Sequence, residues 1–458
     1  MNMMKILAPT GIVGYGFPEE SFHAGIAQKP DLIACDAGST DPGPFYLGSG
    51  KPFTTKSAVK RDMTLMLKAA CTLNIPLIIG SAGGSGGDVH LARDTEIVLE
   101  IAKEHNLSFS FATISSELDK DFLIGELDKG NMHALGAAPL ANENDIRSCT
   151  RIVAQMGVDP IISALDHGAQ VILCGRCYDP APFAAPAIRQ GFSEALATHL
   201  GKILECACIA ATPGSGSDCM MGYLYGDSFA VEPCTPKRKC TTLSVAAHTM
   251  YEKSNPYILP GPGGTLDLRD CTFIQETDRR VRVYGSKFMP QERKNVKLEG
   301  AKSVGYRTIS ICGNRDALFI KELDNTLEGL KERTAVNLQG SDFDYNLDFI
   351  VYGRNGVMGS LEPNPVVTSH EVGLVIDAVS DTQEHADTVC SVARSTLLHY
   401  GYPGRMATAG NLAFPYSPSD ISVGPVYNFA VYCLLENEDP ETLFPCRFFC
   451  IENGEVRS

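Results

Sequence analysis

With 458 residues and a formal net charge of −15 at pH 7, the chain is acidic, which argues against non-specific binding to nucleic acid or to an anionic membrane surface. Its length exceeds what one hydrophobic core usually supports, so we expect two or three domains. Hydrophobic residues make up 44% and charged residues 20% of the chain, which is typical of a soluble globular protein and excludes a disordered one.

Cysteine usage and the N-terminal segment bear on the cellular compartment. The chain has 16 cysteines, most of them inside apolar runs, as expected for free thiols in a reducing environment. The opening sequence MNMMKILAPTG predicts a first strand and not a secretory signal. No apolar run reaches the roughly 18 residues that a transmembrane helix needs. We therefore expect a cytoplasmic protein without a disulfide framework that contacts neither nucleic acid nor membrane.

Strands and helices alternate along the first half of the chain. Short apolar runs bounded by Gly or Pro predict strands, and apolar residues three or four positions apart predict helices. Strands are predicted at residues 4–8, 31–35, 77–79, 107–114 and 171–174, and helices at 18–28, 58–73, 93–104, 145–156, 161–165 and 200–211. This alternation predicts an α/β ligand-binding domain over residues 1–225, with a doubly wound, mainly parallel sheet.

A glycine-rich loop follows the third predicted strand. Residues 77–88 read LIIGSAGGSGGD, with five glycines directly after the apolar run. A glycine loop between a strand and a helix can present backbone N–H groups to an anion. The spacing matches neither the P-loop nor the dinucleotide fingerprint, and glycines 11, 14 and 16 near the N-terminus are also in the wrong order for the latter. We therefore predict an anionic ligand and no nicotinamide cofactor.

A second polar loop follows the strand at residues 31–35. It contains Asp36 and Asp41 together with Ser39 and Thr40, at the sheet edge where α/β proteins bind their ligands. An Asx turn with helix-capping residues is the alternative, but the polar cluster is denser than one turn requires. Four cations follow, at positions 51, 56, 60 and 61. They form either a basic wall opposite the carboxylates or a solvated helix face.

The segment CGRCYDP at residues 174–180 follows the strand at 171–174. Its Arg176 is suited to bidentate recognition of a carboxylate or phosphate, and Asp179 is a nearby acid. A single C-x-x-C pair is weak evidence for zinc or redox chemistry. We expect no metal, and keep as an alternative a metal-dependent enzyme that uses Cys174, Cys177 and His248.

Two further groups could move protons. Lys202 and Glu205 lie three positions apart in an apolar helical stripe, so they form either a buried acid–base pair or a structural bridge. If residues 246–257 are helical, His248, Tyr251 and Glu252 share one face, and histidine is suited to proton transfer near neutral pH. A structural role for His248 is equally open. The loop TPGSGSD at 212–218 resembles the first glycine loop.

Shorter strands dominate the second half. Strands at residues 229–231, 240–245, 266–268, 272–275, 280–284 and 303–312, with a helix at 318–333, predict a mixed β-rich extension over 226–340. Strands at 343–352, 372–379 and 429–433 and a helix at 382–400 predict an α+β, ferredoxin-like portion over 341–458. Residues 353–356, GRNG, and residues 411–417 form the polar loops of this last portion.

Several of these loops, in this order, resemble the acyclic terpene utilisation family, the AtuA-like proteins. The segments that carry the resemblance are PTGIVGYGF near the N-terminus, DAGSTD at 36–41, the loop at 80–87, residues 175–179, GKILEC at 201–206, GSGSD at 214–218 and residues 245–252. The resemblance covers about the first three-quarters of the chain. It implies a catabolic protein that handles branched acids as CoA thioesters, with CoA as part of the substrate, beside a small accessory subunit. It does not fix the reaction.

Two functional hypotheses follow. The first is an enzyme that acts on a small or branched carboxylate, or on its CoA thioester, by hydration or dehydration, isomerisation or C–C lysis. The second is a non-catalytic ligand-binding or scaffold subunit, and in either case we expect a homo-oligomer. The predicted catalytic residues are Asp36, Asp41, Lys202, Glu205 and His248. The predicted substrate contacts are Ser39, Thr40, Gly80, Ser81, Gly83, Gly84, Ser85, Gly86, Arg176, Asp179, Ser215 and Ser217. We expect the four loops that carry most of them to meet at one edge of the sheet.

Overall fold

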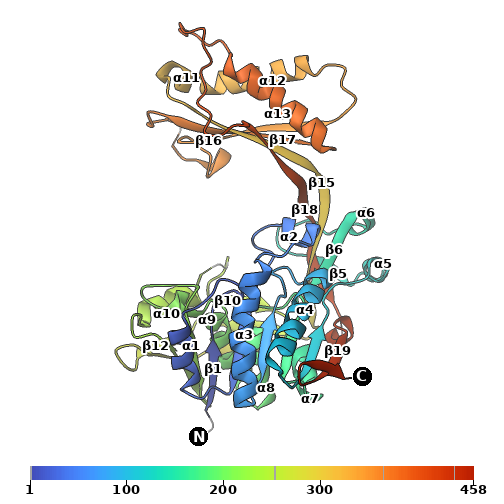
Figure 1. Cartoon of the computed structure of the whole chain (residues 1–458), viewed down its shortest axis with the longest axis vertical. Helices are drawn as coiled ribbons and strands as arrows, with labels where there is room; N and C mark the ends of the chain where they lie inside the picture. The colour runs from blue at the N-terminus through green and yellow to red at the C-terminus, as the bar shows by residue number, and fades with distance from the viewer. Residues whose placement is uncertain (1–2, 252–253, 365, 438, 458) are drawn as a thin grey trace. The chain divides into compact units, whose positions relative to one another are not determined.

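The computed structural model describes residues 3–251, 254–364, 366–437 and 439–457 (Figure 1). The chain forms two compact units, Met1–Lys302 with Phe429–Ser458, and Ser303–Asn428. This division differs from the predicted boundaries at residues 225 and 340. The reason is that strands from the predicted β-rich extension and from the C-terminal end join the large sheet of the first unit.

The first unit is built on an eleven-stranded mixed sheet. Its strands are β1 (Met4–Ala8), β2 (Leu32–Asp36), β3 (Leu77–Gly80), β4 (Phe109–Ile114), β7 (Val171–Cys174), β8 (Met220–Leu224), β9 (Ser228–Pro233), β12 (Thr272–Gln275), β13 (Val281–Tyr284), β19 (Cys446–Glu452) and β20 (Glu455–Arg457). They lie in the order β12-β13-β9-β8-β1-β2-β3-β7-β4-β19-β20. The central strands β1, β2, β3, β7 and β4 pair in parallel, whereas the outer strands on both sides are antiparallel. The expectation of a mainly parallel sheet is therefore wrong. Antiparallel hairpins extend the parallel centre on one side, and the C-terminal strands β19 and β20 extend it on the other.

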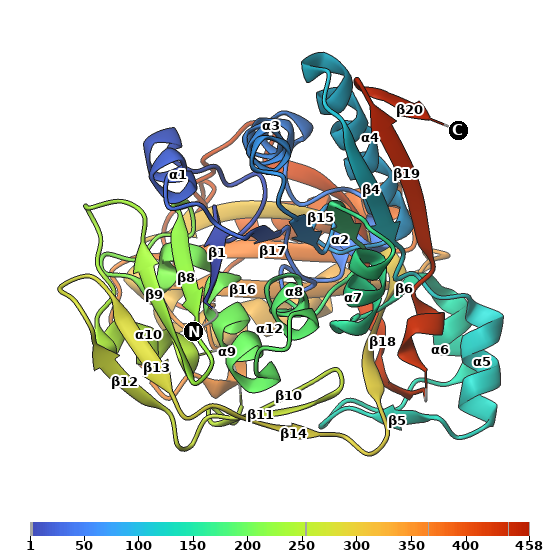
Figure 2. The same ribbon diagram turned by 90° about the horizontal axis from the view of Figure 1, so that it is seen from below.

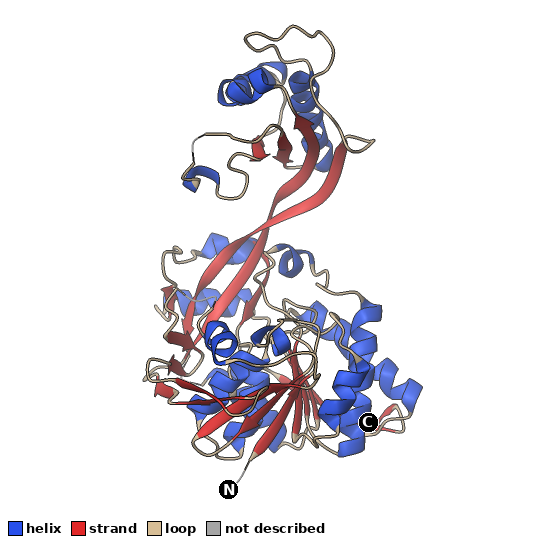
Figure 3. Ribbon diagram, turned by 90° about the vertical axis from the view of Figure 1, so that its left-hand side faces the viewer, coloured by secondary structure: helices blue, strands red, loops and turns tan. Residues whose placement is uncertain are grey.

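Helices cover both faces of this sheet (Figures 2 and 3). The helices of the first unit are α1 (Glu19–Ile26), α2 (Phe45–Ser49), α3 (Lys56–Leu73), α4 (Asp88–His105), α5 (Lys120–Asp128), α6 (Glu143–Ser148), α7 (Asp159–Asp166), α8 (Ala181–Arg189), α9 (Glu194–Leu204) and α10 (Thr242–Thr249), with 3-10 turns η1 (Ala207–Ala210) and η3 (Pro440–Leu443). Of these, α2 and α6 pack beside β6 (Cys149–Ala154). Successive strand residues face opposite sides. Ile6 therefore packs in the buried cluster that contains α8 and α9 residues, and Leu7 in the cluster that contains α3 and α4 residues.

Smaller sheets complete the first unit. Strands β10 (Ile258–Gly261), β11 (Gly264–Asp267) and β14 (Lys287–Pro290) form a three-stranded sheet. β6 (Cys149–Ala154) pairs with residues 298–302 of β15 (Asn295–Asn314), and β5 (Met132–Ala134) pairs with residues 433–435 of β18 (Asp420–Glu436). The helix predicted at 145–156 is therefore wrong beyond Ser148, because pairing with a distant strand overrides local helical spacing. The strand predicted at 240–245 is also wrong, since Thr241 and Ser244 form a capping box that starts α10.

The second unit has an antiparallel sheet with one buried face. It contains α11 (Ala317–Lys321), α12 (Leu323–Asn337), β16 (Tyr345–Tyr352), η2 (Gly359–Leu361), β17 (Val372–Ser380) and α13 (Gln383–Leu398). Residues 306–314 of β15 pair with β17, which pairs with β16 on its other side. Alternate residues of β17 are buried in the same cluster as apolar residues of α12 and α13. None of the described helices is both long enough and apolar enough to cross a membrane.

Candidate functional site

A cavity of about 280 Å³ lies in the first unit, beside the carboxyl ends of β1, β2 and β7. Asp36 is the last residue of β2, Asp179 follows β7, and Glu205 directly follows α9. The lining residues are Gly11, Ile12, Tyr15, Asp36, Gly38, Ser39, Asp41, Pro42, Phe53, Asp179, Glu205, Cys206, Ile209, Gly216 and Tyr251. The cavity therefore combines four carboxyl groups with an aliphatic and aromatic wall.

The four predicted loops lie together around this cavity. Asp36 is paired with Gly80 across β2 and β3, so the loops after these strands leave the sheet side by side. Arg176 Nη1, in the loop after β7, donates to Ser81 Oγ at 3.2 Å. The fourth loop reaches the cavity through Gly216, whose carbonyl accepts from Gly11 N at 2.9 Å. Ser215 and Ser217 of that loop hydrogen-bond to one another and do not line the cavity.

The glycine-rich loop lies behind the cavity and not on its surface. Residues 80–86 are buried, and the lining contains none of them. Several of their N–H groups have partners inside the protein: Gly83 N donates to Asp94 Oδ2 at 2.8 Å, and Gly86 N donates to Ala82 O at 3.0 Å. Those N–H groups are therefore not available to an anion, and the loop supports Arg176. Gly80, Ser81, Gly83, Gly84 and Ser85 also pack within the protein.

Gly86→Ala should destabilise the first unit by about 2–4 kcal/mol. Gly86 has a φ of +69°, and a Cβ there would lie 2.0 Å from Arg176 N, so both backbone strain and overpacking oppose the substitution. The matched control is Gly130→Ala, which has a φ of +76° but open space around the new methyl group and should cost about 1 kcal/mol. Urea unfolding measures both. Equal losses would show that the close contact with Arg176 carries no energy.

Arg176 is bound by the protein's own acceptors. Its side chain is 2% exposed, and it contacts Glu299 Oε2 through Nε at 2.9 Å and Asp179 Oδ1 through Nη1 at 2.9 Å. Glu299 is fully buried and also accepts from Lys297 Nζ at 2.6 Å and from Thr40 Oγ1 at 2.8 Å. Burial alone would raise the pKa of Glu299, but Arg176 and Lys297 lower it to about 2. Arg176 therefore holds the loops together and does not face the cavity as a free cation.

Among the four carboxyl groups that line the cavity, Asp36 has few hydrogen bonds to the protein. Its Oδ2 accepts one hydrogen bond, from Gly38 N at 3.3 Å, and its buried Oδ1 has no hydrogen-bond partner among the described residues. Burial, followed by the nearby charges of Asp179 and Glu205, raises the pKa of Asp36 well above its usual range, against the opposing effect of Arg176. Burial therefore favours the neutral, protonated form of the Asp36 carboxyl group at the cavity.

Glu205 and its neighbours form the opposite wall. Lys202 Nζ lies 3.0 Å from Glu205 Oε1, and both side chains are buried, as the apolar stripe of the helix predicts. Burial raises the pKa of Glu205 to about 7, with Asp179 adding to the effect and Lys202 opposing it. Tyr251 OH lies 3.5 Å from Glu205 Oε1 and 3.0 Å from Cys206 Sγ. Glu205 can therefore gain or lose a proton near neutral pH.

His248 lies behind this wall. Its ring stacks on Tyr251 with the centroids 4.5 Å apart, and it does not line the cavity. Burial and the charge of Lys202 lower the pKa of His248 to about 4, so the ring is neutral at pH 7. Helix α10 ends at Thr249, so the predicted helical face does not reach Tyr251, and Glu252 lies outside the described residues. Among the residues described, no group of three or more His, Cys, Asp or Glu side chains could hold a metal ion, so the set of Cys174, Cys177 and His248 is not assembled.

Other polar residues near the loops have structural partners. Lys56 and Lys60 pair with Glu100 and Glu104 on α4, so these two lysines belong to a solvated helix face. Asp41 Oδ2 accepts from Ser39 Oγ at 2.6 Å at the exposed rim of the cavity.

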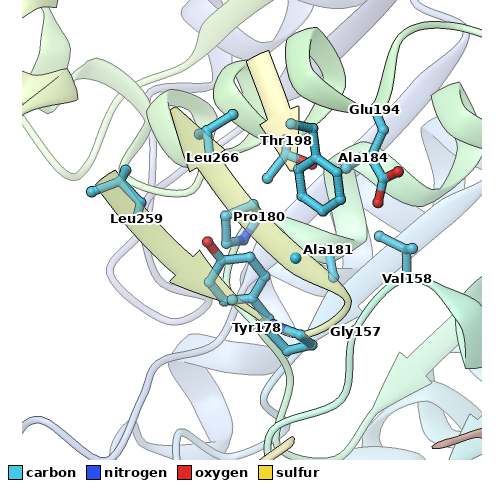
Figure 4. A pocket seen from close by; sticks show the side chains of 14 residues that line it. Gly157, Val158, Tyr178, Pro180, Ala181, Ala184, Glu194, Thr198, Leu259 and Leu266 are labelled. Carbon is cyan, nitrogen blue, oxygen red and sulfur yellow. The ribbon is translucent and has the colours of Figure 1, made fainter. Parts of the chain in front are cut away.

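The loop after β7 also borders a second, smaller cavity of about 20 Å³ (Figure 4). Tyr178 lines it together with Leu259 and Leu266, whereas the next residue, Asp179, lines the larger cavity. A volume of this size holds about one water molecule. We therefore place the functional site at the larger cavity.

Sequence reasoning missed several of these residues. Glu299 lies 123 positions from Arg176, in a strand where only its burial distinguishes it, and no local pattern connects the two. Tyr15, Phe53 and Ile209 line the cavity from loops and a 3-10 turn that have no periodicity. The sequence around Glu299 carries no signal for its burial, because burial is visible only in the folded structure.

Comparison with known proteins supplies one match. The model of the family described as acyclic terpene utilisation family protein AtuA matches residues 56–218 and 226–419, more than half of the chain. The matched segments include the glycine-rich loop, Arg176, Lys202 and Glu205, and begin after the loop that carries Asp36. Comparison with curated proteins and with solved structures gives no match. The chain therefore belongs to the acyclic terpene utilisation (AtuA) family.

Proposed function

We propose that this chain is a catabolic enzyme that transfers protons on the acyl part of a small or branched acyl thioester. The reaction class is hydration or dehydration, isomerisation or C–C lysis. The observation that carries the proposal is the presence, in one cavity, of two buried carboxyl groups, Asp36 and Glu205, whose pKa values are both raised by burial, that of Glu205 to about 7. Buried carboxyl groups with raised pKa values can hold and transfer protons near neutral pH, as acid–base catalysis needs.

In the proposed reaction Glu205 is the base and Asp36 the acid. Ionised Glu205 accepts a proton from carbon next to the thioester carbonyl, and the Asp36 carboxyl donates its hydrogen to the oxygen on which negative charge develops. Lys202, 3.0 Å from Glu205, favours the ionised base. Tyr251 donates to the same group or to substrate from the adjacent wall. Asp41, at the exposed rim, orients substrate and does not share the buried environment of the pair.

The charge of the cavity favours a neutral acyl group over a free carboxylate. Four carboxyl groups line it, and the nearest cations, Arg176 and Lys202, already form ion pairs with Glu299, Asp179 and Glu205. A free acid would add like charge to this surface, whereas a thioester carbonyl would not. The wall formed by Ile12, Phe53 and Ile209 suits an aliphatic chain. CoA would then enter as part of the substrate, and any accessory subunit or second copy would act outside this cavity.

Solvent exchange tests the proposal. The full-length protein is incubated in D₂O with isovaleryl-CoA or with free isovalerate, and deuterium next to the carbonyl is followed by mass spectrometry. We expect enzyme-dependent exchange in the thioester and at least tenfold slower exchange in the free acid. Saturable binding of the thioester without exchange would favour the non-catalytic ligand-binding or scaffold subunit instead, and faster exchange in the free acid would contradict the charge argument.

The pH dependence of kcat/KM should be bell-shaped. Activity should rise as Glu205 loses its proton near pH 7 and fall at higher pH as Asp36 ionises. Because the two carboxyl groups interact, the apparent pKa values of the acid and alkaline limbs describe the pair and not the single residues. Glu205→Gln should remove the acid limb and reduce kcat by about 10²–10⁴-fold. Glu104→Gln, which removes an exposed glutamate on α4, should change neither. An acid limb near the ordinary carboxyl pKa of about 4.3 would contradict the assignment of Glu205 as base.

A further inference from the structure

The second unit contains a cavity of about 550 Å³ that the proposed reaction does not use. It lies between the start of α11 and α12, the loop after β16 and the segment before β17. The lining residues are Arg315, Ala317, Ile320, Lys321, Leu323, Asp324, Arg354, Val366, Val367, Ser369 and His370, all within residues 303–428. Its volume is in the range of cavities that bind small organic molecules.

The cavity is positively charged in an otherwise acidic protein. Arg354 forms a two-pronged ion pair with Asp324, with Nη2 2.5 Å from Oδ2. The side chains of Arg315 and Lys321 have no hydrogen bond or ion pair with any residue that the structure describes. After the Arg354–Asp324 pair is counted as neutral, two positive charges remain uncompensated, although the chain as a whole carries −15. Such a local excess of cations attracts an anion.

The position of Arg354 is set by a tight loop. The loop is the GRNG segment at residues 353–356, one of the polar loops of the sequence. Gly353 has a φ of +89°, and Gly356 N donates to Val351 O at 2.8 Å. A Cβ on Gly356 would lie 2.9 Å from the Val351 carbonyl carbon, so the turn needs glycine there. The loop therefore holds one cation at the cavity, where Arg315 and Lys321 also lie.

The remaining wall is apolar. Ile320, Leu323, Val366 and Val367 line it, and Val366 is 72% exposed to solvent. An exposed valine beside uncompensated cations fits a ligand that has a charged head and an apolar body. A simple inorganic anion would leave this apolar surface in water.

We propose that this cavity is a binding site for an aliphatic carboxylate, with Arg315 and Lys321 contacting the carboxylate and the valines contacting the chain. Arginine and lysine both bind carboxylates by charge-assisted hydrogen bonds. Burial of the chain against Val366 and Val367 supplies the apolar part of the affinity. The site lies within the second unit, so it does not depend on the reaction proposed for the first.

A single tryptophan reports on this site directly, because the chain contains none. The full-length Val366→Trp variant is titrated with octanoate, octanol or inorganic phosphate while its fluorescence is followed. We expect a saturable change with octanoate and at least tenfold weaker binding of octanol and of phosphate. Adding Arg315→Gln and Lys321→Gln should weaken octanoate binding at least tenfold, and adding Arg333→Gln, an exposed cation outside the cavity, should not.

Four results would overturn the proposal. No saturable change with octanoate would show that the cavity does not bind it. Equal binding of octanol would remove the role of the cations, and equal binding of phosphate would remove that of the valines. An unchanged octanoate affinity in the Arg315→Gln, Lys321→Gln variant would contradict the assigned contacts. These fluorescence titrations report only on the cavity of the second unit. Their outcome therefore does not depend on whether the first unit catalyses deuterium exchange.

Discussion

Asp36→Asn should reduce kcat by about 10²–10⁴-fold while making the fold more stable. Asparagine keeps the shape of the side chain and accepts the same hydrogen bond from Gly38 N, but it cannot transfer a proton. Its affinity for the thioester should stay within tenfold of the wild type. Steady-state kinetics and urea unfolding of the same preparations measure both effects.

The gain in stability has a defined pH dependence. Burial and neighbouring carboxylates raise the pKa of Asp36 in the folded protein, so the folded state keeps this proton to a higher pH than the unfolded state does. This costs stability above the unfolded pKa of about 3.9, and the cost disappears below it. The advantage of Asp36→Asn should therefore be present at pH 7 and absent near pH 3.

A second buried aspartate is the matched control. Asp62 is 1% exposed, accepts from Gly14 N at 2.8 Å and from Gly16 N at 3.0 Å, and pairs with Arg61. Asp62→Asn should therefore lower stability, because each of its oxygens has a partner that prefers a carboxylate. If Asp36→Asn lowers stability as much as Asp62→Asn, or keeps full activity, Asp36 is a structural residue and the proposed acid is wrong.

Arg176→Met should destabilise the first unit by about 3–5 kcal/mol. The substitution leaves Glu299 fully buried, with Lys297 as its remaining cation, and frees Asp179 and the Ser81 hydroxyl from their partner. A buried carboxylate that loses part of its compensating charge and a hydrogen bond is strongly destabilising. Urea unfolding at pH 7 measures the loss.

Two companion variants separate the ion pair from the loss of side-chain volume. The double variant Arg176→Met, Glu299→Gln should recover part of the loss, because the carboxylate that has lost Arg176 is then replaced by a neutral amide. Arg189→Met breaks the exposed pair with Asp166 and should cost less than about 1 kcal/mol. If Arg176→Met costs no more than Arg189→Met, the guanidinium is not structural, and the sequence-based prediction that it binds substrate gains support.

The sequence predicts the centre of the fold better than its edges. The strand at residues 171–174 has the predicted bounds, and those at 4–8 and 272–275 do as well, because short apolar runs between turns are sufficient to mark them. The outer strands depend on distant partners. β6 exists because β15 lies beside it, and β19 pairs with β4, more than 300 residues earlier in the chain. Local periodicity carries no information on such pairings.

The candidate site could also be predicted only in part, because the local sequence does not show which distant groups a residue contacts. Carboxyl groups at the ends of parallel strands could be predicted, and so could the buried Lys202–Glu205 pair, because strand order and helical spacing place them. The role of the glycine-rich loop could not, because the same composition serves an anion site or close backbone packing. Several of its N–H groups are used internally, by Asp94 Oδ2 and by backbone carbonyls.

The charge state of the two central carboxyl groups is the most direct test of this account. In protein labelled with ¹³C at the side-chain carboxyls, the Asp36 and Glu205 signals are assigned by their loss in Asp36→Asn and Glu205→Gln and then titrated by NMR. The account predicts that Asp36 titrates well above its ordinary pKa and that Glu205 titrates near pH 7. Ionisation of Asp36 near its ordinary pKa of about 3.9 would contradict it.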